Sequence, residues 1–442
     1  MECSVKDGPI SRSRRRFLKR AAAVWAAPYV VPASALGAEG HTAPSERITI
    51  GCIGVGGQGS GNMSAFLGHG DAQVVAVCDV DKAHRDRAKG TVDAHYGDEG
   101  CASYNDFREL IAREDIDAVS IGTPDHWHSI PVITAARAGK DIYCEKPLSY
   151  SIDEGKAMLA AVQRYKRVFQ TGTWRRSRSA CRLACELVQN GRIGDVQTIR
   201  CYVPQNYQIR GGDFAGIQQE QPVPDGFDYD LWLGPAPDAP YSPGRCHFNF
   251  RWLQDYAEGY ISDWGAHYLD VGQWGNGTDL TGPIMAEGWG KYPRDGMYDA
   301  AIEHYVEFTF ANGVKMISAT SDGSAGKEYG IWFDGSEGRI YVESGAVKSW
   351  PESIAASTIG PHDIHLYDSA DHHGNFLECI RTRNGTAAPI EVAHCSAIIC
   401  HLASIVSLLG RGVRWDPENE CFVDDPEASR LMYRPMRAPW HV

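Results

Sequence analysis

The sequence contains 13 cysteines but no Cys-x-x-C spacing. Zinc ribbons and thioredoxin-like redox centres require that spacing, so both are excluded. There is also no uninterrupted apolar run of the ~18–20 residues that cross a membrane, and we expect no membrane span. No internal repeat or low-complexity tract is present, which excludes repeat architectures and disordered chains.

Positive charge is scarce beyond the N-terminal segment. The formal net charge is −13, and residues 1–38 carry seven Lys or Arg against two Asp or Glu, so the remaining residues carry −18. Such an acidic body repels phosphate backbones and anionic lipid, and nucleic acid is therefore not an expected partner. The 442 residues, 43% of them hydrophobic, suffice for two or three domains with their own cores.

Residues 1–38 have the composition of an export signal. The Arg-rich run 13–19 is followed by the mildly apolar stretch 21–36 and by small residues suited to cleavage. The run Ser-Arg-Arg-x-Phe-Leu-Lys resembles the twin-arginine motif, whose carriers are exported already folded and with a cofactor in place. This resemblance implies a periplasmic or other extracytoplasmic location. The alternative is a basic amphipathic helix at the front of the first domain.

A glycine-rich turn follows the first apolar run of the body, residues 47–53. It reads Gly-Val-Gly-Gly-Gln-Gly and has the G-x-G-x-x-G spacing of a dinucleotide-binding turn. The first glycine permits a tight turn, the second lets the backbone approach a pyrophosphate, and the third lets the next helix pack closely on the strand. With the phosphates at the helix N-terminus, we expect cofactor contacts from Gly54, Gly56, Gly57, Gln58 and Gly59.

An acidic residue follows at the distance that this motif requires. Asp79 lies 20 residues after Gly59, at the end of a second expected strand, 73–78. Its carboxylate would accept hydrogen bonds from a ribose 2′-hydroxyl and would repel a 2′-phosphate. The sequence therefore predicts NAD as the cofactor, in preference to NADP.

Strands and helices then alternate up to residue 171. Expected strands at 118–122, 141–144 and 168–171 are separated by expected helices at 130–138 and 152–165. This alternation predicts parallel βαβ units, and hence a doubly wound, NAD-binding Rossmann domain over residues 47–171. The residues expected at its cofactor-binding edge are Thr123, Pro124, His128, Glu145 and Lys146.

The sequence offers one close histidine pair in this domain, His126 and His128. Two histidines at this spacing beside Pro124 more often cap a helix or line a cleft than bind a metal. We therefore expect no metal.

The second half has the pattern of an antiparallel sheet. Apolar and polar residues alternate over 302–310, an Asn-Gly turn follows at 312–313, and a second apolar strand runs over 314–320. Further strands are expected near 284–289, 329–334 and 339–342, with helices between 374 and 409. The sequence thus predicts an α/β protein in which the Rossmann domain is followed, over 172–442, by an α+β substrate-binding and oligomerisation domain with a large, mainly antiparallel open sheet and C-terminal helices.

Three residues have the types that hydride transfer from a carbinol needs. Lys146, in Glu-Lys-Pro, follows an expected strand and would project toward the nicotinamide position. Asp263 and His267 are four residues apart, on one face of an expected helix. His267 could take the hydroxyl proton, Lys146 could hold the alkoxide, and Asp263 could orient the imidazole or bind a neighbouring hydroxyl. Alternatively, His267 is a structural histidine.

The G-x-G-x-x-G turn, Glu-Lys-Pro and the D-x-G-x-H sequence at 263–267 together resemble the motifs of the Gfo/Idh/MocA oxidoreductase family. This family includes glucose–fructose oxidoreductase and inositol dehydrogenase, and the resemblance covers residues 47–442. It implies catalytic roles for Lys146, Asp263 and His267, and a sugar or glycoside as the small-molecule partner. It also implies a homodimer or homotetramer with contacts through the open sheet.

Two departures from the family pattern lie beside the aspartate. Glu258-Gly259 stands where the family has two glycines, and the bulky Trp264 lies within the motif. Both would reshape a sugar pocket. Candidate substrate-binding residues are Arg176, Tyr202, Arg251, Tyr256 and Asp270, and the alternative for each is a surface ion pair or a buried tyrosine.

These features predict an exported NAD-dependent oxidoreductase that acts on a sugar or glycoside hydroxyl by hydride transfer. We expect the cofactor to be tightly bound, because no free nicotinamide pool is expected outside the inner membrane. One alternative is a redox-neutral NAD-dependent glycoside hydrolase or lyase, which oxidises, eliminates, hydrates and reduces in turn. Another is a non-catalytic sugar or cofactor sensor, since fold alone does not prove catalysis.

Overall fold

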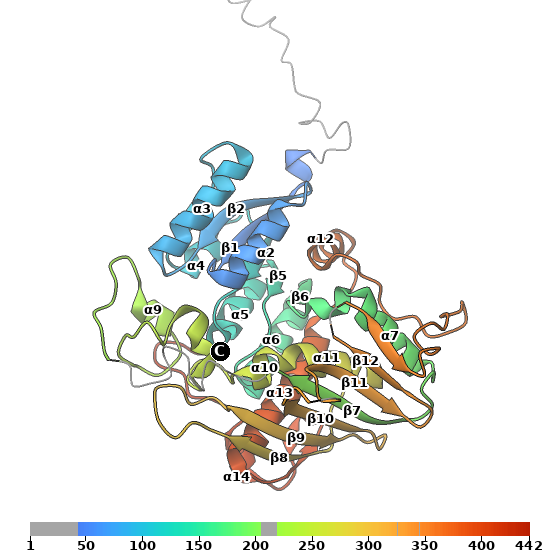
Figure 1. The fold of residues 1–442 in the computed structure, drawn as a ribbon. Coiled ribbons are helices and arrows are strands. Elements are labelled where there is room, and N and C mark those ends of the chain that lie inside the picture. Colours follow the sequence, from blue (N-terminus) through green and yellow to red (C-terminus); the bar gives the residue numbers. More distant parts are fainter. Residues whose placement is uncertain (1–42, 205–218, 325, 344) are drawn as a thin grey trace, which may run out of the picture. The chain divides into compact units, whose positions relative to one another are not determined.

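The computed structural model describes residues 43–204, 219–324, 326–343 and 345–442. The predicted export signal at residues 1–38 lies outside them. In the N-terminal segment up to Arg47, the described part contains one 3₁₀ turn, η2 (Pro44–Glu46). Residues Ile48–Val442 form one compact unit that contains two β-sheets (Figure 1).

The first sheet is parallel throughout, with the strand order β3-β2-β1-β4-β5-β6. Apolar cores on both of its faces bury the strands, as their continuous apolar sequences predict. The chain order reverses between β1 and β4, which is where doubly wound sheets open a ligand crevice. The strands are β1 (Ile48–Ile53), β2 (Ala72–Cys78), β3 (Ala102–Tyr104), β4 (Ala118–Ile121), β5 (Asp141–Cys144) and β6 (Phe169–Thr171).

Local capping sets the helices that connect these strands. Asp81 begins α3 by accepting a hydrogen bond from the Ala83 N–H, and Ser151 begins α6 in the same way with the Glu154 N–H. α3 ends at Gly97, whose φ of 74° lies in the left-handed region. The helices of this domain are α2 (Gly57–Leu67), α3 (Lys82–Tyr96), α4 (Phe107–Ile111), η3 (Asp125–Trp127), α5 (Ser129–Arg137) and α6 (Ile152–Tyr165).

The second sheet has nine strands in the order β13-β12-β11-β7-β10-β9-β8-β14-β15. All its neighbours pair antiparallel except β7 and β10, so the mainly antiparallel prediction is confirmed. The predicted hairpin around Asn312 joins β9 to β10. The strands are β7 (Val196–Val203), β8 (Met285–Lys291), β9 (Glu303–Thr309), β10 (Lys315–Thr320), β11 (Gly330–Gly335), β12 (Arg339–Val342), β13 (Val347–Trp350), β14 (Val413–Asp416) and β15 (Cys421–Phe422).

Three helices, α7, α11 and α13, share one apolar core with a face of this sheet (Figure 1). The opposite face carries a smaller cluster around Tyr202 and Trp332. The remaining elements are η4 (Trp174–Ser177), α7 (Ser179–Gln189), α9 (Tyr229–Leu233), η5 (His247–Trp252), α10 (Tyr260–Asp263), α11 (Gly265–Asn276), α12 (His372–Thr382), α13 (Ile390–Leu409) and α14 (Pro426–Arg430).

The C-terminal helices return to the first sheet. Phe376 and Leu377 of α12 join the core that contains Ile50, and Ile390 of α13 joins the core on the other face. Among the described residues, α13 is the one helix long and apolar enough to cross a membrane, with a mean hydropathy of 1.9. Glu391, His394 and His401 interrupt this helix, so it is not an uninterrupted apolar run of the kind that the sequence was found to lack. In addition, 83% of the window is buried, as in a core helix.

Candidate active site

A cavity of about 350 Å³ lies where β1, β2, β4 and β5 end. One wall comes from the glycine-rich turn, Asp79, Gly122–Asp125 and Glu145-Lys146 of the first domain. The facing wall comes from a later segment of the chain and is largely aromatic. Its lining residues are Phe227, Leu231, Trp232, His247, Phe248, Phe250 and Arg251.

The glycine-rich turn has the backbone that a dinucleotide requires. Gly54 has φ of +74°, and a Cβ there would lie 2.7 Å from the Thr123 backbone nitrogen. A Cβ on Gly59 would lie 1.7 Å from the Gly54 carbonyl oxygen, so α2 packs on the turn as predicted. Gly56, Gly57 and Gln58 line the cavity at the N-terminus of α2. The turn therefore fits a pyrophosphate that approaches its backbone.

Asp79 lies at the end of β2 and lines the same cavity. Its Oδ2 accepts a 2.8 Å hydrogen bond from the Val55 N–H, and its Oδ1 accepts a 2.9 Å bond from the Asp81 N–H. These two bonds fix the carboxylate beside the glycine-rich turn. The arrangement suits recognition of a ribose diol and opposes a 2′-phosphate.

Replacing Asp79 by asparagine is expected to weaken NAD binding about tenfold or more and to narrow the preference for NAD over NADP. The variant loses a charged acceptor and the repulsion of a 2′-phosphate. Equilibrium titration with both dinucleotides measures the effect. Asp86→Asn, on the exposed side of α3, is the matched control and should bind both as the parent does. An unchanged preference in Asp79→Asn would refute the ribose role.

Lys146 and Arg251 share one carboxylate at the edge of the cavity. The Lys146 ammonium donates a 2.7 Å hydrogen bond to Asp263 Oδ1 and a 3.0 Å bond to the Asp263 carbonyl oxygen. Arg251 Nε lies 3.3 Å from the same Oδ1. Burial alone would raise the pKa of Asp263, but the charges of Lys146 and Arg251 hold it well below its usual range. Asp263 is therefore ionised and forms ion pairs with both Lys146 and Arg251.

His267 lies one turn after Asp263. The sequence predicted that both residues belong to one helix, but the structure has two helices here, because α10 ends at Asp263 and α11 begins at Gly265. The imidazole is buried, with its ring centre 5.5 Å from that of Trp174. Its Nδ1 has no hydrogen-bond partner among the described residues. Burial, and then the charges of Lys146 and Arg175, lower the pKa of His267 well below its ordinary value. The ring is therefore neutral and able to accept a proton.

Glu145 is buried behind Lys146. Its Oε1 accepts a 2.9 Å hydrogen bond from Asn62 of α2, and its Oε2 accepts one of 3.2 Å from the Lys146 N–H. A Cβ on Gly172 would lie 2.7 Å from the same carboxylate. Glu145 thus links the end of β5 to α2 and fixes the backbone that presents Lys146.

Asp125 is a cavity residue that sequence reasoning missed, although it directly follows the predicted Thr123 and Pro124. Asp125 is the first residue of η3 and is 6% exposed. Burial, and secondarily the negative charge of Asp263, raise the pKa of Asp125 to about 8. The available signal was a carboxylate at the end of a parallel strand, where cofactor contacts are expected.

Asp125→Asn is expected to flatten the pH dependence of stability. The folded-state pKa of about 8 lies above the ordinary 3.8, so the native state holds a proton that the unfolded state releases above pH 4. The stability that depends on this proton is fully present below pH 3.8 and is lost as the pH rises through 8. Between pH 5 and 8 the thermal midpoint of the parent should fall relative to Asp125→Asn. Parallel curves for the two proteins would contradict the raised pKa.

His128 was predicted to bind the cofactor, but the structure places it behind the cavity wall. Its Nδ1 lies 2.8 Å from the Pro147 carbonyl oxygen and its Nε2 3.0 Å from that of Thr123. The ring is fully buried and holds these two loops together. Thr123 and Pro124 do line the cavity. His126 lies 3.2 Å from the Trp232 carbonyl oxygen and forms no pair with His128.

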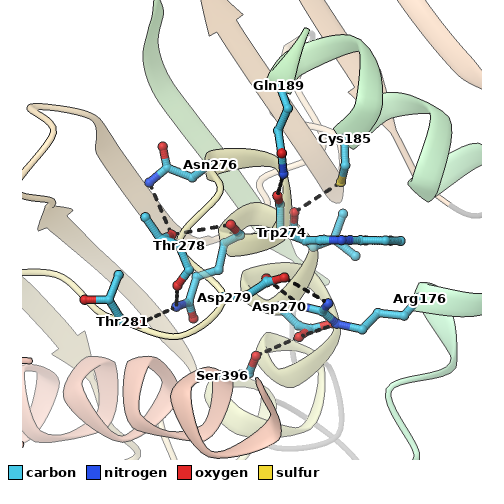
Figure 2. A network of polar contacts seen from close by, with 12 residues as sticks. Arg176, Cys185, Gln189, Asp270, Trp274, Asn276, Thr278, Asp279, Thr281 and Ser396 are labelled. Carbon is cyan, nitrogen blue, oxygen red and sulfur yellow. Dashed lines mark hydrogen bonds and ion pairs between the residues drawn. The ribbon is translucent and has the colours of Figure 1, made fainter. Parts of the chain in front are cut away.

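Arg176 and Asp270, two predicted substrate residues, form a buried ion-pair network instead (Figure 2). Arg176 donates to both oxygens of Asp270 at 3.0 and 2.8 Å, and also pairs with Asp279 at 2.9 Å. Ser396 of α13 donates a 2.7 Å bond to Asp270. The guanidinium also lies 5.0 Å from the centre of the Trp274 ring. All these polar groups are satisfied by one another, so the network joins η4, α11 and α13.

Tyr202 and Tyr256 also lie away from the described cavity. Tyr202 packs with Trp332 on the opposite face of the second sheet. Tyr256 is fully buried against Trp232, at 5.0 Å between ring centres. Of the five candidates for substrate contact, Arg251 is the one that lines the cavity.

Two family models match the chain. One, the NAD-binding Rossmann fold of an oxidoreductase family, covers residues 48–173, and the other, the C-terminal alpha/beta domain of that family, covers residues 205–442. The uncharacterized oxidoreductase YrbE of Bacillus subtilis is 24% identical over 359 residues, which cover 77% of this chain and 89% of that protein.

Two further relatives match over shorter stretches. Inositol 2-dehydrogenase of Rhizobium meliloti is 32% identical over 34% of this chain and 44% of its own length. A glycosyl hydrolase family 109 protein of a Shewanella species is 34% identical over 32% of this chain and 35% of its own length. The chain thus matches less than half the length of these two proteins.

Solved structures share the fold. A levoglucosan dehydrogenase in complex with NADH and levoglucosan superposes with a TM-score of 0.61 at 18% identity, over 83% of this chain and 99% of that one. The WlbA dehydrogenase of Bordetella pertussis, in complex with NADH and UDP-GlcNAcA, has a TM-score of 0.61 at 16% identity, over 84% and 99%. With both domain models matched, the chain belongs to the Gfo/Idh/MocA oxidoreductase family and begins its folded body with that family's NAD-binding Rossmann domain.

Proposed function

We propose that this protein is an NAD-dependent oxidoreductase that oxidises a hydroxyl of a sugar or glycoside and keeps its cofactor bound between half-reactions. One observation carries the proposal. Lys146 and Arg251 line the wall of the expected dinucleotide cavity, and both form ion pairs with the ionised Asp263. The neutral imidazole of His267 lies one turn away, and its Nδ1 has no hydrogen-bond partner within the part of the chain that the structure describes. Such a set combines alkoxide stabilisation with a proton acceptor.

When bound, NAD supplies the hydride acceptor. The Lys146 ammonium donates a hydrogen bond to the substrate oxygen and stabilises the negative charge that develops on it. His267 is neutral before the reaction and accepts the hydroxyl proton, and the negative charge of Asp263 favours the protonated ring that results. Asp263 holds the ammonium and, through Arg251, ties it to η5. Trp174 fixes the imidazole plane by an edge-to-face contact.

A strap, residues 226–251, supports tight retention of the cofactor. Its first residues are bonded to the β2–α3 loop, where the Lys82 N–H donates to the Gly226 carbonyl at 2.9 Å and the Asp228 N–H donates to the Val80 carbonyl at 3.0 Å. Asn105 adds a 2.7 Å side-chain bond to Asp228. Because the strap forms the aromatic wall of the cavity, the dinucleotide would lie between it and the first sheet.

The substrate class rests on the relatives, whose names include inositol 2-dehydrogenase and levoglucosan dehydrogenase. Export through the twin-arginine route and assembly as a homodimer or homotetramer complete the proposal. A captive cofactor suits that location, since an exported enzyme cannot draw on a cytoplasmic nicotinamide pool.

A second candidate is a redox-neutral glycoside hydrolase that oxidises, eliminates, hydrates and reduces on one bound NAD. The 34% identity to a glycosyl hydrolase family 109 protein favours it. Both candidates use the same proton acceptor and the same cation. A non-catalytic sensor would require neither.

The test is to purify the protein without added cofactor, denature it and quantify the dinucleotide released. About one equivalent of NAD(H) per chain is expected. The loaded protein is then offered sugars with an artificial electron acceptor and, separately, aryl glycosides. Acceptor reduction supports the oxidoreductase and aglycone release supports the hydrolase, whereas an empty site would contradict a captive cofactor.

A further inference from the structure

We propose that Asp81, His84 and His247 form a binding site for a divalent transition metal of the zinc class, which joins the strap to the first domain. One ligand atom from each of these side chains lies within 4.8 Å of the other two. Asp81 and His84 belong to the start of α3, and His247 belongs to η5. The site would therefore link two segments more than 160 residues apart. All three side chains line the cavity proposed above for the dinucleotide, so the ion would share that cavity with the cofactor, although the proposal does not rest on the hydride chemistry.

The two oxygens of Asp81 have separate tasks. Oδ1 caps α3 by accepting a 2.8 Å hydrogen bond from the Ala83 N–H. Oδ2 lies 3.7 Å from His247 Nε2 and 4.0 Å from His84 Nε2. The ligand atoms of His84 and His247 lie within 4.8 Å of each other. Ligands around a tetrahedral zinc are about 3.4 Å apart, so side-chain shifts of up to about 1.4 Å would bring all three onto one ion.

A further carboxylate orients His84 for this task. Asp79 Oδ2 lies 3.7 Å from His84 Nδ1, on the side of the ring opposite Nε2. At 3.7 Å this contact is longer than a hydrogen bond, but the negative charge of Asp79 favours a proton on Nδ1, the nearer nitrogen, and a proton there leaves the Nε2 lone pair free for a metal. This contact is independent of the three ligands and points to the same use of Nε2.

The position of His247 is also set by its surroundings. Its φ of 55° lies in the left-handed region, an unfavourable conformation for a non-glycine residue. Its ring stacks on Phe227 at 5.6 Å and meets His84 at 4.9 Å between centres. The side chain is 43% exposed, which gives an ion a path from solvent and leaves room for a water as fourth ligand. Two imidazoles and one carboxylate suit zinc or cobalt(II).

The test uses the full-length protein with its bound cofactor, treated with EDTA and dialysed against micromolar Zn²⁺ or Co²⁺. Elemental analysis is expected to give about one metal per chain, and Co²⁺ is expected to show the visible absorption of a tetrahedral site. His247→Ala and His84→Ala should each weaken metal affinity about 100-fold or more. Asp81→Asn, which retains an oxygen to cap α3, should weaken it as well.

His69→Ala is the matched control, because His69 also lies within 3.3 Å of an aspartate, Asp371, but belongs to no group of three possible metal ligands among the described residues. Its metal content should equal that of the parent. Absence of stoichiometric metal in the parent would overturn the proposal. So would equal affinity in the parent and in folded His247→Ala and Asp81→Asn variants, with folding checked by thermal melting.

Discussion

Replacing His267 by alanine is expected to lower turnover at least ~100-fold while bound NAD stays at the parent level. The imidazole is the neutral proton acceptor of the proposed site, and its Nδ1 has no partner among the described residues. It does not line the dinucleotide cavity of the described structure, so its loss should leave cofactor contacts intact. The measurement pairs steady-state turnover with the NAD released on denaturation.

His304→Ala controls for the loss of a buried imidazole. His304 lies on β9 of the second sheet, is 4% exposed and does not line the cavity. Its Nε2 lies 2.9 Å from Ser318 Oγ. This variant is expected to lose stability but to keep the turnover per folded chain. If His267→Ala kept parental turnover, or lost it only in proportion to unfolding, the catalytic assignment would fail.

Lys146→Met is expected to reduce turnover by roughly 10²–10³-fold, since it removes the cation that stabilises the developing alkoxide. The variant has a second signature, because the charge of Lys146 also lowers the pKa of both Asp263 and His267. Without it, both pKa values should rise. The acid limb of the pH–rate profile should therefore move to higher pH in the residual activity.

Lys156→Met is the matched control for Lys146→Met. Lys156 also makes a long-range contact, since its ammonium donates a 2.7 Å hydrogen bond to the Glu420 carbonyl oxygen. However, Lys156 lies on α6 and does not line the cavity. Its turnover and pH profile should match those of the parent. Equal losses in the two variants, or an unshifted acid limb in Lys146→Met, would argue that Lys146 acts only by holding the fold.

The first domain could be predicted closely because its signals are local. β5 (Asp141–Cys144) and α6 (Ile152–Tyr165) have the bounds that the sequence predicts, since an uninterrupted apolar run and the Ser151 cap define them. The glycine spacing likewise predicted the contacts of Gly54 and Gly59. In the second domain, the Asn-Gly turn predicted the β9–β10 pair, but nothing local indicates that β7 pairs parallel with β10.

The site was predictable only where a motif marks it. Lys146 and Asp263 lie 117 positions apart, yet each belongs to a recognisable motif, and they form a 2.7 Å ion pair. Arg176 and Asp270 belong to no such motif, and the sequence left each of them open between a substrate contact and an ion pair. Their actual partners come from η4, α11 and α13, and only the tertiary structure brings these together.

If the dinucleotide lies behind the strap as we propose, the strength of its own contacts would not alone set its residence time. It would leave when the hydrogen bonds between residues 226–251 and the β2–α3 loop open. Its exchange rate would then follow the free energy of that local opening. Dilution would not empty such a protein on the timescale of turnover, whereas warming would accelerate exchange steeply, in step with the loosening of one segment.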